Sequence, residues 1–381
     1  MKKIALILDT KVDSGGALGM CLTKINYIKK LSGMNLVVIT TYKSTSDLLR
    51  KEYKINNFFY NKNSIINRFI NFFFRLKISS ISSLETCLKK LKIDKIFFIT
   101  PSYLNILIKK IDYNYTVFDL SHLDKRLINL SEHDIKTRKI RDLSYEEASK
   151  HAKFIIIGTS ENKDFFKKYY KCSPEKLKVI KFVPYICTLE DINNKIPSSD
   201  RLFKNFLLYP AQYWEHKNHK FLINFFNKFG TMDKLKNITL VCTGYDKGQL
   251  KYLKELVNSK NLNKKIKLLN YVSDDELKLL YKNSIGVVFP SLIGSHSFPL
   301  YEAFYYKKPI FYNEDILSKE FKELVYLIDI KSEQDLYNKI CSFLDNKKKS
   351  QKIINNAEKK FYQIFNEEKI INQLKFVLID N

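Results

Sequence analysis

The sequence predicts an α/β protein built from two domains, each with a parallel β-sheet. Short continuous apolar runs, typical of strands covered on both faces, alternate with segments of helical spacing. This alternation stops at the polar stretch EDINNKIPSSD (190–200) and then begins again. A chain of 381 residues is also too long for one ordinary hydrophobic core, so two domains are expected.

The first half opens with the apolar run KIALILD (3–9), which reads as a buried strand. A glycine-containing loop and a segment of helical spacing, ALGMCLTKINYIKKL (17–31), come next. Further runs of the strand type follow at 35–41, 95–100, 116–121, 153–160 and 178–185. We therefore expect an N-terminal Rossmann-like domain over residues 1–188.

The second half repeats the pattern. Its expected strands lie at 206–212, 238–244, 266–272, 285–291, 308–313 and 324–329. Ser273 and Glu276 form a capping-box pattern, which predicts a helix start at this point, and the segment 332–340 begins in a similar way. A second Rossmann-like domain is expected over residues 200–360.

Composition limits the possible partners and compartment. The formal net charge is +26. The excess of lysine results either from the codon bias of an AT-rich genome or from binding to an anionic membrane, a phosphorylated substrate or nucleic acid. The sequence shows no basic stripe interleaved with stacking aromatic residues, so nucleic-acid binding is not favoured. Six scattered cysteines without a CxxC pair indicate a reducing compartment. With neither a signal-peptide pattern nor an apolar run long enough to span a bilayer, we expect a cytoplasmic or peripheral protein.

Two loops that precede helical segments could hold an anion. Asp13, Gly15 and Gly16 lie between the first strand and its helix, where glycine permits close backbone approach, although a plain turn is an equal alternative. The stretch YPAQYWEHKNHK (209–220) concentrates donors before the apolar segment FLINFF. It could bind an anion, bind a metal or coat the surface. His216 and His219 could pair on a metal, but no third ligand is apparent.

The segment 287–311 combines a strand, a loop of small polar residues and a helix with Pro299 in its first turn. Glu302 stands in that helix among apolar residues on nearly every side. A buried carboxylate is costly unless it is paired or hydrogen-bonded. Glu302 is therefore either an exposed residue at the helix edge or an acceptor for ligand hydroxyls, beside an anion at the helix N-terminus.

This segment resembles the signature P-S-x-x-E-G-F-G-x-P-x-x-E-A of retaining GT-B glycosyltransferases of family 4, also called glycosyl transferases group 1. The residues in register with it are Pro290, Ser291, Pro299, Glu302 and Ala303. The stretch 209–220 is similar to the donor-site loop of the same family, and Lys217 falls on its lysine. The resemblance implies two Rossmann-like domains facing a central cleft, with the acceptor side N-terminal and the donor side C-terminal. It also implies that a C-terminal helix (361–381) packs back on the N-terminal domain.

The resemblance further implies roles for individual residues. Lys217 would bind the donor diphosphate with help from the Ser297 and Phe298 amides, and Glu302 would accept the ribose hydroxyls. His122 would contact the donor sugar, unless it is an ordinary structural histidine. Lys217, Glu302 and His122 form the expected catalytic set, with Asp13 and Gly15 on the acceptor side. The full donor set is Gly16, Gln212, Lys217, Gly244, Tyr271, Gly294, Ser295, His296, Ser297, Phe298, Leu300 and Glu302.

The implied reaction is metal-independent transfer from a nucleoside-diphosphate sugar, with UDP or GDP as the nucleotide and no cofactor. Two positions depart from the family pattern: Gly294 replaces the first glutamate of the motif, and Gln212 replaces an arginine. These departures leave the donor sugar open. They also support an alternative, a catalytically degenerate GT-B protein that binds sugars or acts as a scaffold.

The segment SIINRFINFFFRLKISS (64–80) is aromatic, contains Arg68, Arg75 and Lys77, and has helical spacing. It is either a core helix or a basic amphipathic surface for anionic lipid, where a lipid-linked saccharide acceptor would be found. The second alternative suggests a bacterial enzyme of lipopolysaccharide O-antigen or capsule synthesis. Such an enzyme would lie at the cytoplasmic face of the inner membrane.

Overall fold

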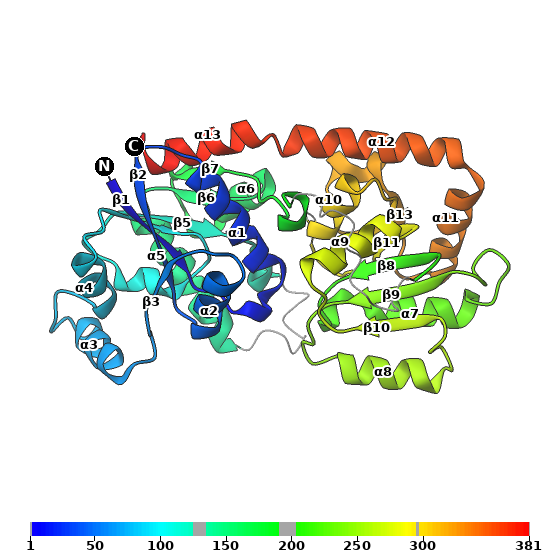
Figure 1. Cartoon of the computed structure of the whole chain (residues 1–381), viewed down its shortest axis with the longest axis horizontal. Helices are drawn as coiled ribbons and strands as arrows, with labels where there is room; N and C mark the ends of the chain where they lie inside the picture. The colour runs from blue at the N-terminus through cyan, green and yellow to red at the C-terminus, as the bar shows by residue number, and fades with distance from the viewer. Residues whose placement is uncertain (1, 125–134, 190–202, 295–296, 381) are drawn as a thin grey trace. The chain divides into compact units, whose positions relative to one another are not determined.

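The computed structural model describes residues 2–124, 135–189, 203–294 and 297–380 (Figure 1). The chain divides into two compact units. The first contains the described residues up to Val183 together with those from Asn366 onward, and the second runs from Pro184 to Phe365. No helix of the described residues has the length and apolar character needed to cross a bilayer.

The first unit is built on a parallel sheet of seven strands, in the order β3-β2-β1-β4-β5-β6-β7. The strands are β1 (Lys2–Leu8), β2 (Met34–Thr40), β3 (Asn57–Phe59), β4 (Lys95–Phe98), β5 (Tyr113–Val117), β6 (Ile155–Ile157) and β7 (Leu177–Val179). Its helices are α1 (Gly16–Lys29), α2 (Lys43–Lys51), α3 (Ile65–Arg75), α4 (Ser83–Lys90), α5 (Ile135–His151), α6 (Ser160–Tyr170) and α13 (Glu367–Leu378). Short 3₁₀ turns include η1 (Val12–Ser14), η2 (Tyr103–Leu107), η3 (Ser121–Leu123) and η5 (Pro174–Lys176). The strand order reverses between β1 and β4, which makes this edge the topological switch point of the unit.

The sequence pattern placed the fifth strand too late, at 116–121, whereas β5 ends at Val117. The strand begins with Tyr113 and Asn114, which break the apolar pattern, and Asn114 is buried against α13. The Asn114 side chain donates to the Val377 carbonyl at 3.0 Å and accepts from the Phe154 amide. A buried asparagine with such partners is stable in a strand. In the sequence, however, it interrupts the apolar run by which a buried strand is predicted. The pattern also missed the short strand β3.

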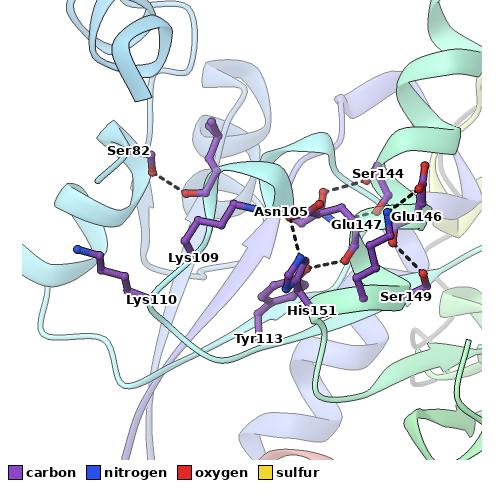
Figure 2. Close-up of polar contacts among 12 residues, drawn as sticks. Ser82, Asn105, Lys109, Lys110, Tyr113, Ser144, Glu146, Glu147, Ser149 and His151 are labelled. Atoms are coloured by element: carbon purple, nitrogen blue, oxygen red, sulfur yellow. Dashed lines mark hydrogen bonds and ion pairs between the residues drawn. The ribbon is translucent and has the colours of Figure 1, made fainter. Parts of the chain in front are cut away.

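The long helix α5 is held to the chain that follows β4 by polar contacts (Figure 2). Asn105 donates to the Ser144 carbonyl at 2.8 Å, and the Ser144 hydroxyl lies 3.0 Å from Asn105 Oδ1. Lys109 pairs with Glu147, whose carbonyl accepts from the Tyr113 hydroxyl. These contacts, with the buried Tyr145 and Ala148, fix α5 against the sheet.

The second unit is built on a six-stranded parallel sheet in the order β10-β9-β8-β11-β12-β13. The strands are β8 (Phe206–Pro210), β9 (Thr239–Thr243), β10 (Ile266–Leu269), β11 (Gly286–Phe289), β12 (Ile310–Asn313) and β13 (Tyr326–Ile328). Its helices are α7 (His219–Phe229), α8 (Leu250–Ser259), α9 (Asp274–Asn283), α10 (Phe298–Tyr305), α11 (Glu333–Asp345) and α12 (Lys347–Ile364), with 3₁₀ turns η6 (Tyr185–Cys187), η7 (Glu215–Lys217) and η8 (Lys319–Leu324). The expected α/β class with two parallel sheets is confirmed, and so is the capping box of Ser273 and Glu276.

The first unit ends before residue 188 because η6 packs on the second unit. The Tyr306 hydroxyl of α10 donates to the Ile186 carbonyl at 3.1 Å. The expected boundary at 190–200 lies almost entirely outside the described residues. At the C-terminus, α13 belongs to the first unit: Gln373 donates to the Val179 carbonyl, and Lys95 donates to that of Val377. In Figure 1 this helix, in red, lies beside β7.

Candidate functional site

The strand order of the second unit reverses between β8 and β11, so the loops that follow these strands flank a switch point. Ligands of open α/β sheets bind outside the carboxyl ends of the strands at such a point. The two loops are joined by hydrogen bonds. The Leu292 amide donates to the His216 carbonyl at 2.8 Å, and the Ser291 hydroxyl donates to the same oxygen. Asn218 donates to the Pro290 carbonyl at 3.3 Å. The two stretches singled out from the sequence therefore form one structure.

Lys217 occupies the last position of η7, and Asn218 follows in the left-handed conformation, with φ 55°. The Lys217 carbonyl accepts from the Tyr209 hydroxyl at 2.5 Å, which fastens the loop to β8. Its ammonium group lies 5.4 Å from the centre of the Phe289 ring, at the end of β11. The half-buried cation thus sits at the switch point of the second sheet.

The two histidines of the same loop are buried and packed against aromatic rings. His219 lies between Tyr209 and Tyr213, with ring centres 4.7 and 4.8 Å apart. Burial, with a further contribution from the Lys217 charge, lowers the pKa of His219 to about 3. The ring is therefore neutral at physiological pH. His216 stacks on Trp214. These surroundings favour packing of the helix start over the metal-binding alternative.

The loop after β11 is shaped by glycine and tyrosine. Gly294 has φ +109°, a conformation that a side chain rarely adopts. The Tyr312 hydroxyl donates to the Gly294 carbonyl and lies 3.0 Å from the Ser297 hydroxyl. Ser297 holds the N-cap position of α10 without capping it through its side chain. Ser295 and His296 lie outside the described residues.

Glu302 is buried in α10, with 8% of its surface exposed, so the reading as an exposed residue at a helix edge is wrong. The Tyr281 hydroxyl of α9 donates to its Oε2 at 2.5 Å. Burial raises the pKa of Glu302 to about 7, although the Tyr281 hydrogen bond opposes the rise, and the Asp274 charge adds to it. A carboxyl group poised between its two protonation states is a feature of functional sites. Leu300, in the preceding turn, is fully buried.

Three further expected donor residues lie on the neighbouring loops. A Cβ atom at Gly244 would stand 2.5 Å from the Ala211 carbonyl oxygen, so only glycine lets the loop after β9 approach the loop after β8. Tyr271 is about half exposed and stacks on Tyr245 at 4.3 Å. Gln212 accepts from the Trp214 indole at 2.8 Å and thereby orients that ring.

The remaining expected residues belong to the first unit. Asp13 lies in η1, Gly15 has φ +57°, and Gly16 starts α1. His122 is buried in η3, with only 1% of its side chain exposed. Its Nε2 lies 3.1 Å from the Tyr170 hydroxyl, which in turn donates to Asp142. This set of contacts favours the structural alternative for His122.

A buried ion pair that no sequence pattern indicated lies at the switch point of the first sheet. Lys62 Nζ lies 2.6 Å from Asp9 Oδ1, and the two side chains are 8% and 6% exposed. The Ser102 hydroxyl donates to Asp9 Oδ2 at 2.6 Å. Burial alone would lower the pKa of Lys62, but the Asp9 carboxylate raises it above the ordinary value. Asp9 follows β1 directly, so the rule for strand ends could have identified it; Lys62 could not be found by that rule.

Several known proteins resemble this chain in sequence or in fold. Residues 191–360 match the family model of glycosyl transferases group 1. An uncharacterized glycosyltransferase, MJ1059, from Methanocaldococcus jannaschii is 31% identical over 159 residues, which cover 40% of this chain and 38% of the relative. The O-antigen chain mannosyltransferase RfbU from Salmonella typhimurium is 29% identical over 42% of each chain. The matches thus span about two fifths of the relatives' length.

A solved structure covers the whole chain. The Anabaena protein Alr3699/HepE, crystallised with UDP-glucose, superposes with a TM-score of 0.76 and 16% sequence identity over 100% of both chains. This likeness, together with the two parallel sheets, establishes the fold. The chain has the GT-B fold, and its residues 191–360 match the family model of glycosyl transferases group 1.

Proposed function

We propose that this chain is a glycosyltransferase that moves a sugar from a nucleoside-diphosphate sugar to a saccharide acceptor, with retention of anomeric configuration. The observation that carries the proposal is the joining of two loops at the switch point of the second sheet, through the His216 carbonyl. Because Lys217 follows His216, this contact holds Lys217 close to the loop after β11 that contains Ser291. The family match covers the same residues, and a structural neighbour was crystallised with UDP-glucose.

The chemistry follows from the charges of the site. As the nucleotide leaves the anomeric carbon, negative charge builds on the diphosphate. A preorganised cation and backbone amides stabilise that charge without reorganising. Lys217 supplies the cation, and the first turn of α10, at Ser297 and Phe298, supplies the amides. Glu302, held by Tyr281, accepts the ribose hydroxyls. In the front-face mechanism the leaving phosphate helps to deprotonate the acceptor. Because Lys217 and the amides stabilise the charge of the leaving diphosphate, the proposed transfer uses no metal ion.

The acceptor is proposed to be a lipid-linked saccharide of bacterial lipopolysaccharide or capsule synthesis, used at the cytoplasmic face of the inner membrane. Support comes from the Salmonella relative, which is an O-antigen chain mannosyltransferase. The nucleotide is proposed to be UDP or GDP.

A thermal-shift screen of the full chain against UDP-, GDP-, ADP- and CMP-linked sugars tests the donor site. A ligand at 100 times its Kd stabilises the folded state by about 2.7 kcal/mol. One nucleotide class should stabilise the parent and a Lys220→Ala control, because Lys220 is exposed at the start of α7. The same class should fail to stabilise Lys217→Ala and Glu302→Ala. If every variant responds equally to the ligand, the assignment of the site is wrong.

The alternative, a degenerate sugar-binding or scaffold protein, has one specific observation in its favour. Gly294 replaces the glutamate of the family motif, and its φ of +109° means that the backbone here is built for glycine. Release of free nucleotide from a nucleotide sugar, measured with a saccharide acceptor, discriminates the two functions. Donor binding without turnover of any offered acceptor would favour the alternative.

A further inference from the structure

The outer face of α3 is apolar and uncovered. Ile65, Phe69, Phe72 and Leu76 follow one another at helical spacing, so they line one face of the helix. These residues, with Ile66 and Ile78 beside them, are between 53% and 84% exposed. No residue of α3 is buried, so the interpretation of this segment as a core helix is wrong. Large apolar side chains gathered on one exposed face mark an interaction surface.

The opposite face of α3 is firmly attached to the first unit. Phe74 packs against the core of that unit. Asn71 Oδ1 accepts from both the amide and the hydroxyl of Ser83, at 3.0 and 2.9 Å, and Asn67 donates to the Asn61 carbonyl. In Figure 1 the helix lies beside α4. The helix is therefore seated by Phe74 and two asparagines, and it presents a larger apolar face outward, unlike an ordinary surface helix.

The charged side chains of the segment that carries this face have one sign. The sequence contains no acidic residue between Glu52 and Glu85. Arg68 and Arg75 are seven positions apart, hence on the same side of α3, and both are exposed. Lys77 follows the helix with φ +60° and is exposed as well. An apolar helix face bordered by arginine and lysine complements a surface that is apolar inside and anionic outside.

We infer that α3 is a membrane-docking element that lies in the interface of an anionic bilayer. The exposed aromatic and aliphatic side chains, Phe69 and Phe72 among them, enter the acyl boundary, and Arg68 and Arg75 contact lipid phosphates. A second copy of the chain would bring the same basic residues together and repel, so lipid is the better partner. The inference does not depend on transferase activity. If that activity holds, docking would bring the first unit to a lipid-linked acceptor.

Co-sedimentation of the full chain with vesicles tests the inference. The parent should bind vesicles that contain phosphatidylglycerol, bind pure phosphatidylcholine vesicles more weakly, and release as salt is raised. Phe69→Ser/Phe72→Ser should lower the partition coefficient at least about tenfold. Arg68→Gln/Arg75→Gln should lower it by about 30-fold, because each basic residue near an anionic surface contributes roughly 1 kcal/mol. The residues changed are exposed, so the variants should fold.

Two matched controls keep the test specific. Phe165→Ser removes an exposed phenylalanine from α6, and Lys251→Gln/Lys254→Gln removes two exposed charges from α8. Both should bind vesicles as the parent does. Equal binding by all variants, or no binding by the parent, would overturn the inference. A parent dimer that the Phe69→Ser/Phe72→Ser variant converts to monomer would instead assign the face to a second copy. Donor binding in the thermal-shift screen should be the same for all of these variants, which separates this result from the test of the proposed function.

Discussion

Substituting Glu302 by glutamine should stabilise the protein at high pH. The pKa of this carboxyl rises from 4.5 to about 7 because the group is buried. Each unit of difference between folded and unfolded pKa corresponds to about 1.4 kcal/mol. The ionised carboxylate therefore costs the folded state about 3 kcal/mol. Because the folded state binds the proton more tightly, the free energy of unfolding should fall as pH rises from about 4.5 to about 7 and level off above that.

Glutamine has nearly the shape of the protonated acid, and its carbonyl can still accept from Tyr281. Glu302→Gln should therefore equal the parent at pH 4 and exceed its free energy of unfolding by up to about 3 kcal/mol at pH 8. The assay is urea unfolding followed by tryptophan fluorescence. Trp214 is the single tryptophan of the chain and belongs to the second unit, so the signal reports the unit that contains Glu302.

Two controls define the result. Glu255→Gln removes an exposed carboxylate of α8 and should leave the pH profile unchanged. Tyr281→Phe removes the hydrogen bond to the carboxylate and should steepen the loss of stability with pH. An equal pH profile for Glu302→Gln and the parent would refute the reasoning. Under the proposed function, in which Glu302 accepts the ribose hydroxyls, the gain should also have a functional cost. A neutral acceptor binds hydroxyls more weakly than a carboxylate does, so donor affinity should fall about tenfold.

Three further outcomes are expected. Lys62→Met leaves the Asp9 carboxylate buried without its cation and should destabilise the first unit by about 3–5 kcal/mol. Hydrogen exchange should then become faster in β1 and stay unchanged in the second unit. Gly294→Ala should lower the free energy of unfolding by about 1–2 kcal/mol because of the positive φ. Gly294→Glu should not raise turnover, and a gain in nucleotide release by this variant would contradict the prediction. Ser273→Ala removes the helix cap and should lower the free energy of unfolding by about 1 kcal/mol, read from tryptophan fluorescence.

Features that depend on residues close together along the chain were predictable from the sequence. The apolar runs of β1, β2 and β11 mark strands because a parallel sheet is covered on both faces, so the buried part of each of these strands is a nearly continuous apolar run. The start of α9 follows from its own cap, and the start of α10 from Pro299. Lys217 was identified by the resemblance of its donor-rich loop to the donor-site loop of the family, and this loop follows β8 at the switch point of the sheet.

Features that depend on what covers a side chain were decided only by the tertiary structure. The apolar pattern of 64–80 was also compatible with a core helix, yet no described residue covers the outer face of α3, and Asn67 and Asn71 hold its other side to the protein. Glu302 could have been exposed, but α9 brings Tyr281 over it.

Lys62 meets Asp9 across more than fifty residues of sequence, which no local pattern reports. The sequence by itself determined most of the strands, several helix starts and the loops at the strand ends, because these arise from local periodicity and capping. Burial, ion pairing and protonation were decided by the fold, because they depend on contacts between elements that lie far apart along the chain.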